Sequence, residues 1–434
     1  MTVGPATDEY PPSLPAGDVM TGPVPPPRVL LVSSTLDDDG GIPVCVGQLA
    51  GALADLGVDV VVSGQCSGEP AAAVRAVAGH PRVTVEAFHE PWTLAGQWRA
   101  ARRMRRLVGR VAESARRERR GLVVHLHGVW VATMTAAAAA GREAGAAVVV
   151  SPHGMLRREA LRKSRWRKMA VWCGGLRREV AAAETLHATS PDEAEDLRTL
   201  LPGCRPRLVP LGVTPPADPA RGRDPAAPRR AGYLGRILPI KNLDTLLRAW
   251  QHAAPPGWRL SIDGPGPEAT VAGLRDLARR LGIGDRVDFG GAVPLAALGD
   301  HFATLDLFIL PSRSEAFALV VGEALAAGVP AIVTTAAPWE GVVARGCGWS
   351  VPPGEPELAR AIAEATALDP GALAARGRAG REWVRSEYSW PRIARRHLDE
   401  LYGHAASGDD RPLLVSPTAT GDAEVSSHRP PDIP

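Results

Sequence analysis

Two glutamates, Glu315 and Glu323, stand eight positions apart in the stretch SRSEAFALVVGEALAAGVPAIV (312–333). Every residue from Ala316 to Val333 except Glu323 is apolar, glycine or proline. An ionised carboxylate in such surroundings is costly unless it is paired or hydrogen-bonded. An internal arginine or a backbone donor is one candidate partner for Glu323. The other is a ligand diol, because one carboxylate can accept hydrogen bonds from two neighbouring hydroxyls.

The residues around these glutamates predict a strand over 305–310, a loop, and a helix from about Phe317 to Ala327, which Gly328 ends. The first amides of that helix belong to Phe317, Ala318 and Leu319. They are free donors that suit an anionic group. Carboxylates for hydroxyls beside an amide cup for phosphate are what a sugar nucleotide requires.

Cations and glycines at two other strand ends fit the same ligand. Arg236 and Lys241, in YLGRILPIKNL, can stabilise the negative charge of a leaving diphosphate. Gly40 and Gly41 close the loop after the first strand and precede a helix, so a phosphate can approach the backbone there. Taken alone, the two cations also fit a solvated loop, and a Gly-Gly pair also fits an ordinary turn.

Two further features lie in the first half of the chain. His153 follows the strand 146–151 directly, at the edge of the sheet where ligands bind. Asp37, Asp38 and Asp39 could hold a divalent cation on a diphosphate, but Arg236 and Lys241 already serve that group. We therefore expect a solvated acidic loop and no metal there.

The elements that position these residues predict an α/β protein with two Rossmann-like, doubly wound domains facing each other across a cleft. Continuous apolar runs alternate with helical patterns, which is typical of parallel sheets covered on both faces. The expected parts of the chain are an unstructured Pro-rich N-terminus, two domains joined by a linker, a helix returning to the first domain, and an unstructured tail. Their ranges are 1–27, 28–213, 214–230, 231–388, 389–403 and 404–434.

Composition and charge exclude other classes. The chain has 434 residues, 45% hydrophobic and 22% charged, which suits two globular domains. A net charge of +3 gives no overall basic field, so we expect no nucleic-acid partner. The five cysteines are odd in number and follow no CxxC spacing, which favours a reducing cytosol over a disulfide framework or a zinc site. No apolar run of about 18 residues or secretory signal is visible, and no GxGxxG follows the first strand of either domain.

The E-x7-E spacing followed by ALAAGVP resembles glycosyltransferase family 4, whose members have the GT-B fold and use nucleotide-sugar donors. The resemblance covers roughly residues 28–402 and includes a G-R-x4-K element at Arg236 and Lys241. It implies that Glu315 contacts the donor hexose and Glu323 the nucleotide ribose. The resemblance also implies that the donor site includes Gly40, Gly41, Asp263, Gly264, Phe317, Ala318 and Leu319. It implies that the enzyme uses no metal or other cofactor.

The stretch SPHGMLRREALRK (151–163) is similar to an exopolysaccharide-type subgroup of that family. The similarity implies that His153 touches the donor sugar and places His127 and Trp130 on the acceptor side. Three departures stand out: Ala318 where the family usually has glycine, Leu211 in place of a polar residue, and Arg158-Glu159 in place of Pro-Trp. By the resemblance, the methyl group of Ala318 narrows the space beside the donor sugar, which bears on the choice of donor.

The resemblance implies a retaining, metal-independent transferase that moves a hexose from a UDP- or GDP-sugar to an acceptor in polysaccharide, lipopolysaccharide or glycolipid synthesis. Two basic stretches, 99–120 and 156–179, could dock on anionic lipid and so hold a cytoplasmic protein at the inner face of the plasma membrane, or could be solvated helix faces. A sugar-nucleotide epimerase of the same form and a non-catalytic sugar-nucleotide binder remain as alternatives.

Overall fold

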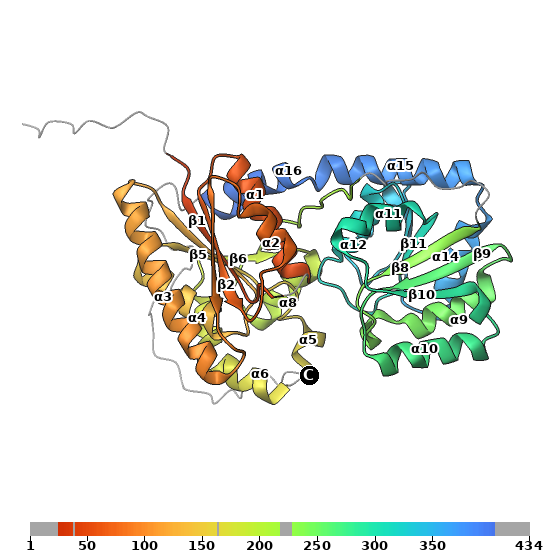
Figure 1. Cartoon of the computed structure of the whole chain (residues 1–434), viewed down its shortest axis with the longest axis horizontal. Coiled ribbons are helices and arrows are strands. Elements are labelled where there is room, and N and C mark those ends of the chain that lie inside the picture. The colour runs from red at the N-terminus through yellow and green to blue at the C-terminus, as the bar shows by residue number, and fades with distance from the viewer. Residues whose placement is uncertain (1–24, 38–39, 163–164, 218–227, 404–434) are drawn as a thin grey trace, which may run out of the picture.

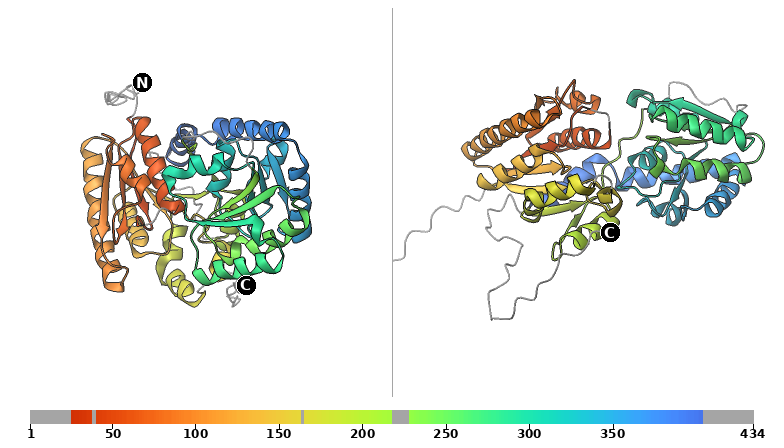
Figure 2. Two further views of the ribbon diagram at one scale, coloured as in Figure 1. Left: turned by 45° about the vertical axis from the view of Figure 1, so that its right-hand side comes forward. Right: turned by 90° about the horizontal axis from the view of Figure 1, so that it is seen from below.

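The computed structural model describes residues 25–37, 40–162, 165–217 and 228–403, arranged as two α/β units (Figure 1). Seen from below, the two units lie side by side (Figure 2). The expectations for Asp38 and Asp39, the tail after residue 403, most of the N-terminal segment and most of the linker fall outside the described residues.

The first unit is built on one parallel sheet of seven strands. They are β1 (Arg28–Ser33), β2 (Val60–Cys66), β3 (Val83–His89), β4 (Leu122–His127), β5 (Ala147–Ser151), β6 (Thr185–Ala188) and β7 (Arg207–Leu208). Their order in the sheet is β3-β2-β1-β4-β5-β6-β7. The chain therefore changes direction across the sheet between β1 and β4, and ligands of doubly wound folds bind at such a point.

Helices cover both faces of this sheet because the side chains of its strands point alternately to either side. Val29 and Leu31 of β1 join the core formed with α1, whereas Leu30 and Val32 join the core formed with α3 and α4. The helices are α1 (Gly41–Asp55), α2 (Ala72–Val77), α3 (Leu94–Arg117), α4 (Ala132–Glu143), α5 (Arg158–Arg162), α6 (Arg165–Val171), η1 (Trp172–Leu176), α7 (Arg177–Ala181) and α8 (Pro191–Leu200).

The second unit repeats the arrangement with six parallel strands. They are β8 (Arg229–Leu234), β9 (Trp258–Asp263), β10 (Val287–Gly291), β11 (Leu307–Leu310), β12 (Ala331–Thr334) and β13 (Gly348–Val351). Their order is β10-β9-β8-β11-β12-β13, with the change of direction between β8 and β11. The two sheets confirm the predicted fold class. β8 begins at Arg229, inside the segment expected to be linker.

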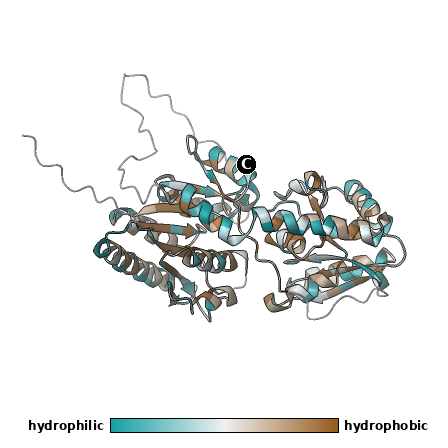
Figure 3. Ribbon diagram, turned by 90° about the horizontal axis from the view of Figure 1, so that it is seen from above, coloured by the Kyte–Doolittle hydropathy of each residue, from teal (hydrophilic) through white to brown (hydrophobic). Residues whose placement is uncertain are grey.

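The helical elements of the second unit lie around its sheet, and the last two return to the first unit. They are η2 (Pro239–Lys241), α9 (Leu243–Ala253), α10 (Glu268–Arg280), η3 (Gly284–Arg286), η4 (Leu295–Ala297), α11 (Leu298–Ala303), α12 (Leu319–Ala326), α13 (Gly341–Ala344), α14 (Glu355–Ala367), α15 (Pro370–Glu387), α16 (Trp390–Arg396) and η5 (His397–Leu401). Long α15 packs against α12, and α16 packs against α1. The outer helices of the molecule carry many hydrophilic residues, whereas the strands are largely hydrophobic (Figure 3). A bridge between Val213 and Ser389 ties the two crossing segments together.

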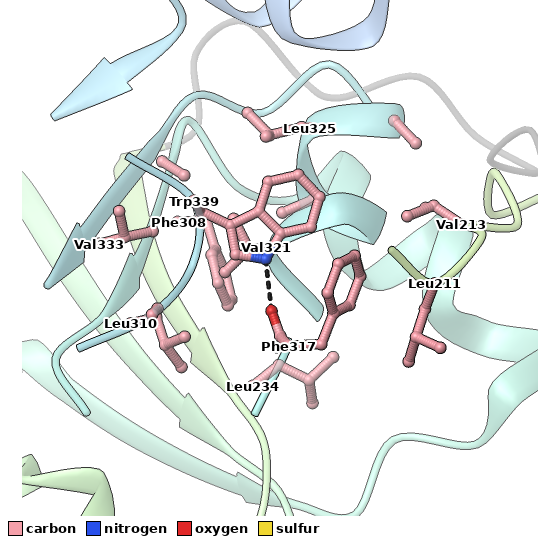
Figure 4. Close-up of a cluster of buried hydrophobic side chains, with 14 of the residues drawn as sticks. Leu211, Val213, Leu234, Phe308, Leu310, Phe317, Val321, Leu325, Val333 and Trp339 are labelled. Atoms are coloured by element: carbon pink, nitrogen blue, oxygen red, sulfur yellow. Dashed lines mark hydrogen bonds between the residues drawn. The ribbon is translucent and has the colours of Figure 1, made fainter. Parts of the chain in front are cut away.

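The core of the second unit holds the helix that carries Glu323. Phe317, Val321 and Trp339 pack together in it, and the Trp339 indole donates a hydrogen bond of 2.6 Å to the Phe317 carbonyl (Figure 4). In the part of the chain that the structure describes, none of the helices combines the length and apolar character needed to cross a bilayer.

Candidate active site

Lys241 and Glu315 form an ion pair at the carboxyl edge of the second sheet. Lys241 ends the turn after β8, and Glu315 lies in the loop after β11, so the two flank the point where the strand order reverses. Lys241 Nζ donates to Glu315 Oε1 over 2.5 Å, and Ser312 Oγ donates to the same oxygen over 2.6 Å. The two side chains are only 18% and 10% exposed, so water screens the pair weakly.

Arg236 lies in the same loop after β8 as Lys241, where this loop contacts the loop after β9. The Gly235 amide donates to the Asp263 carbonyl over 3.0 Å, and a Cβ on Gly264 would lie 1.9 Å from the Gly235 carbonyl oxygen. Gly264 has a φ of 134°, which favours glycine. Asp263 and Gly264 thus support the Arg236 loop. The Arg236 side chain is exposed and makes no hydrogen bond or ion pair with any residue that the structure describes.

Glu323 lies on α12 and lines a pocket between the two units. Its carboxylate has no hydrogen-bond or ion-pair partner within the described ranges, so the internal arginine considered above is not seen there. Burial raises the pKa of this carboxyl to about 7. The other lining residues come from α1, the crossing segment, η4, α11, α12 and α16: Val44, Gln48, Gly212, Thr214, Pro215, Pro216, Ala217, Leu295, Leu298, Leu319 and Trp390.

The helix carrying Glu323 begins at Leu319, two residues later than predicted. Ala318 precedes it with φ 63° and ψ 64°, a left-handed conformation that cannot continue a right-handed helix. Phe317 is a core residue, so only its backbone can border the site. The usual glycine at position 318 in the family has a physical reason in this conformation, which only glycine adopts without strain.

On the first unit, His127 and His153 face each other at the ends of β4 and β5. Their rings are stacked with centroids 5.1 Å apart, and His127 Nδ1 lies 2.9 Å from His153 Nε2. Burial lowers the pKa of His153 to about 4. Burial and the neighbouring histidines lower the pKa of His127 well below its usual range. Both imidazoles are therefore neutral at pH 7 and can exchange hydrogen bonds but carry no charge.

A buried carboxylate that sequence reasoning missed fixes the turn carrying His153. Glu193, on α8, accepts hydrogen bonds from the Gly154 amide over 2.6 Å and from the Thr189 amide over 2.8 Å. His153 and Gly154 have φ values of 51° and 75°, so this turn is held in a conformation that an unrestrained chain rarely adopts. Glu193 therefore positions His153 through the backbone.

Two contacts bring the His153 turn against the Glu315 loop. The Arg157 guanidinium donates to the Glu315 carbonyl and pairs with Asp196 over 3.2 Å. A Cβ on Gly154 would lie 2.7 Å from the Ala316 Cβ, so the two loops touch. The predicted residues of both halves thus meet in one place. The sequence places Arg157 in the basic stretch 156–179, where its charge does not distinguish it from the neighbouring arginines.

The remaining predicted residues border this place less directly. Gly40 and Gly41 lie at the start of α1, and a Cβ on Gly41 would meet nothing within 4 Å, which leaves open space at that helix end. Trp130 is half-buried, and its indole donates to the Met155 carbonyl over 3.2 Å, so it braces the segment after the His153 turn.

The Asp37 carboxylate is hydrogen-bonded to other residues of the first unit. It accepts hydrogen bonds from the Trp92 indole over 2.7 Å, from the Ser67 hydroxyl over 2.9 Å and from the Gly68 amide. Partial burial acts to raise the pKa of this carboxyl, but the hydrogen bonds outweigh it and lower the pKa to about 2. These contacts hold Asp37 against the loop after β2.

Two doubly wound sheets that bring cations, carboxylates and histidines together at their strand ends are the arrangement of the GT-B fold. The family profile "Glycosyl transferase 4-like domain" matches residues 40–214, and the profile "Glycosyl transferases group 1" matches residues 228–367. The chain belongs to glycosyltransferase family 4 and is a glycosyltransferase.

Among similar proteins is the D-inositol 3-phosphate glycosyltransferase of Kribbella flavida, 30% identical over 86% of this chain and 94% of that protein. A GDP-mannose-dependent alpha-(1-6)-phosphatidylinositol monomannoside mannosyltransferase of Mycobacterium tuberculosis is 34% identical over 40% of this chain and 47% of its own length. Among solved structures, Anabaena HepE in complex with UDP and glucose has a TM-score of 0.65 at 19% identity, covering 87% of this chain and 100% of HepE, which shows a shared fold.

Proposed function

We propose that this glycosyltransferase moves a hexose from a UDP- or GDP-sugar to an acceptor hydroxyl with retention of configuration and without a metal. The observation that carries the proposal is Glu323. It is a carboxylate in apolar surroundings with no protein partner in the described residues, and it borders a pocket between the units. A ribose diol would supply the hydrogen bonds that the protein does not.

The diphosphate would lie against Arg236 and Lys241. As the bond from the anomeric carbon to the phosphate oxygen breaks, negative charge grows on the phosphate, and these cations stabilise it. The Lys241–Glu315 pair holds its ammonium in place before the reaction, so little reorganisation is needed. Glu315 and His153 orient the hexose. The acceptor oxygen bonds the anomeric carbon, and its proton passes to the leaving phosphate on the same face of the sugar.

Both donor classes occur among similar proteins. The Mycobacterium tuberculosis relative is named for GDP-mannose, and HepE was solved with UDP and glucose. The names of the two relatives also fit a polar or lipid-linked acceptor. We assign the acceptor side to the region of His127 and Trp130, in the subgroup that builds exopolysaccharides and related surface glycans.

Peripheral contact with anionic lipid would involve the second basic stretch more than the first. Several arginines of the 99–120 stretch pair with acidic neighbours, as Arg110 does with Glu86 over 2.6 Å. In the 156–179 stretch, Trp166 is 85% exposed, and an exposed indole suits a membrane interface. Vesicle co-sedimentation with and without anionic lipid tests this contact, with Trp166→Ser as the weakened variant.

Thermal shift with UDP-, GDP- and ADP-sugars, each with and without EDTA, tests the donor and the metal together. We expect one base to stabilise the protein to the same degree in both conditions. Transfer to acceptor extracts followed by NMR of the product then gives the anomeric configuration. An inverted product, or stabilisation that EDTA abolishes, would contradict the proposal. Conversion of the nucleotide sugar without any acceptor would instead support an epimerase.

A further inference from the structure

Three potential metal ligands from three separate elements converge beside the candidate site. Cys45 comes from α1, His127 from the end of β4, and His153 from the turn after β5. One ligand atom of each lies within 4.8 Å of the other two. Cys45 and His127 are buried and His153 is half-buried, so the group can be reached from the side of His153.

The protein leaves one of these ligands unsatisfied. His127 Nε2 is buried and has no hydrogen-bond partner among the described residues, although the side chain is only 1% exposed. A buried ring nitrogen of this kind is costly to leave unpaired and is a ready ligand when it carries a lone pair. His127 Nδ1 lies 2.9 Å from His153 Nε2, and this hydrogen bond is given up when both rings bind one metal, because each neutral imidazole has a single lone pair.

The chemistry of the group selects its metal. A thiol and two neutral imidazoles, with no carboxylate among them, suit Zn²⁺ and similar borderline ions and not Mg²⁺ or Ca²⁺. Tetrahedral zinc with bonds of about 2.0–2.3 Å separates its ligand atoms by about 3.3–3.6 Å. Ligand atoms that lie within 4.8 Å of one another would move closer by up to about 1.5 Å to reach that geometry.

We propose that Cys45, His127 and His153 form a binding site for Zn²⁺ or a metal of similar softness, and that the bound metal inhibits the enzyme. Binding replaces the Cys45 S–H bond by a metal–sulfur bond and releases one proton to solvent. It also turns His153 from a group that orients the donor sugar into a metal ligand. The inhibition rests on the proposed role of His153, whereas the metal site itself does not.

The test uses the full chain with Zn²⁺ and with Co²⁺ as a spectroscopic substitute. The variant is Cys45→Ser. The matched control is Cys66→Ser, because Cys66 is also buried in the first unit but contacts the Gly68 carbonyl and belongs to no such ligand group within the described ranges. Folding of each variant is checked by its thermal transition without metal.

The wild type and Cys66→Ser should bind one Co²⁺ per chain with the absorption of a thiolate–cobalt bond, and Cys45→Ser should lack that absorption. Zn²⁺ should bind Cys45→Ser more than about tenfold more weakly, because loss of an outer-shell partner alone costs that much. Zn²⁺ should also release one proton and weaken donor binding, measured relative to each variant without metal.

Equal Zn²⁺ affinity in the wild type and Cys45→Ser, or no thiolate–cobalt absorption in the wild type, would overturn the site. Metal binding that leaves donor affinity unchanged would overturn the inhibition. Failure of the transferase proposal looks different. In that case the metal-free wild type transfers no sugar, while the cobalt spectrum and the proton release are still observed.

Discussion

The two faces of the candidate site handle charge in opposite ways. The second unit presents a lysine–carboxylate pair and an exposed arginine, Lys241, Glu315 and Arg236. The first unit presents imidazoles that burial keeps neutral, His127 and His153. In the proposed mechanism, cations of the second unit stabilise the leaving diphosphate, and the neutral His153 of the first unit joins Glu315 in orienting the sugar.

Deeper in the first unit the same neutrality extends through a hydrogen-bonded chain. His125 contacts the Tyr402 hydroxyl and the Ser151 hydroxyl, each over 2.6 Å, and Ser151 Oγ lies 2.5 Å from His187 Nδ1. Tyr402 follows η5, so the returning C-terminal segment is locked to the first sheet through these groups. In the second unit, burial likewise favours the uncharged form of Glu323, but it does so by raising the pKa of the carboxyl to about 7.

The largest effect is expected from a substitution among the charged residues of the second unit. Lys241→Ala should lower turnover of a sugar nucleotide at least about tenfold, which corresponds to about 1.4 kcal/mol of transition-state stabilisation. The loss arises because the leaving phosphate loses a cation and Glu315 loses its partner. Steady-state kinetics with the donor found by thermal shift measures it.

Arg280→Ala, an exposed change on α10, is the control for removing a positive charge far from the loops after β8 and β11. Activity of Lys241→Ala equal to that of this control would remove Lys241 from the mechanism.

The next largest effect is expected from a substitution that disturbs the neutral histidines of the first unit. Glu193→Ala should lower kcat by about tenfold and also lower the free energy of unfolding, because buried amides lose an acceptor at about 1–3 kcal/mol each. Glu193→Gln retains a carbonyl oxygen and should recover part of both. If kcat stays at the wild-type value while stability falls, Glu193 supports the fold without positioning His153.

The sequence was sufficient for the sheets because their strands are continuous apolar runs. The strands predicted at 146–151 and 305–310 correspond to β5 (Ala147–Ser151) and β11 (Leu307–Leu310). Strands β3, β7 and β13 were not foreseen. In β3, the polar residues Thr84 and Glu86 interrupt the apolar residues. Strand β7 has two residues and β13 is half-buried, so none of the three shows the continuous apolar pattern.

The sequence predicted those site residues that directly follow a predicted strand and whose side chains suit the expected chemistry. Lys241, Glu315 and His153 each follow a predicted strand, so the topology brings them to one edge of a sheet. Glu193 and Arg157 act on backbone atoms far away in sequence, and no spacing encodes such a contact. The same holds for Cys45 with His127 and His153. Their approach across three elements is invisible to a search for CxxC spacing.

A pH comparison sharpens the contrast between the faces. Glu323 titrates at about 7 in the folded protein and near its usual value of 4.5 when unfolded, so ionising the unfolded state lowers the free energy of unfolding between pH 4.5 and 7. Glu323→Gln removes this loss. Relative to wild type, the variant should gain up to about 3 kcal/mol between pH 5 and pH 8 in urea unfolding.

The buried histidines give stability the opposite pH dependence, and they do so equally in the wild type and in Glu323→Gln. The folded-state pKa of His187 is lowered to about 4, so stability falls as the pH drops from about 6.5 toward that value. Subtracting wild type from Glu323→Gln cancels this contribution. A difference that does not change with pH would show that Glu323 is solvated or paired in solution, contrary to the proposed ribose contact.

The smallest expected effect tests the departure from the family at position 318. Ala318 lies in the left-handed region, where a side chain costs about 1–2 kcal/mol, but glycine also gives the unfolded chain about 0.5–1 kcal/mol more entropy. Ala318→Gly should therefore raise the free energy of unfolding by about 1 kcal/mol or less. Because the methyl group also lies at the start of α12, in the segment that the proposed function places at the donor, its removal should broaden the range of hexoses accepted. Unchanged donor preference at equal or higher stability would mean that Ala318 is a strained neighbour of the site and does not contact the sugar.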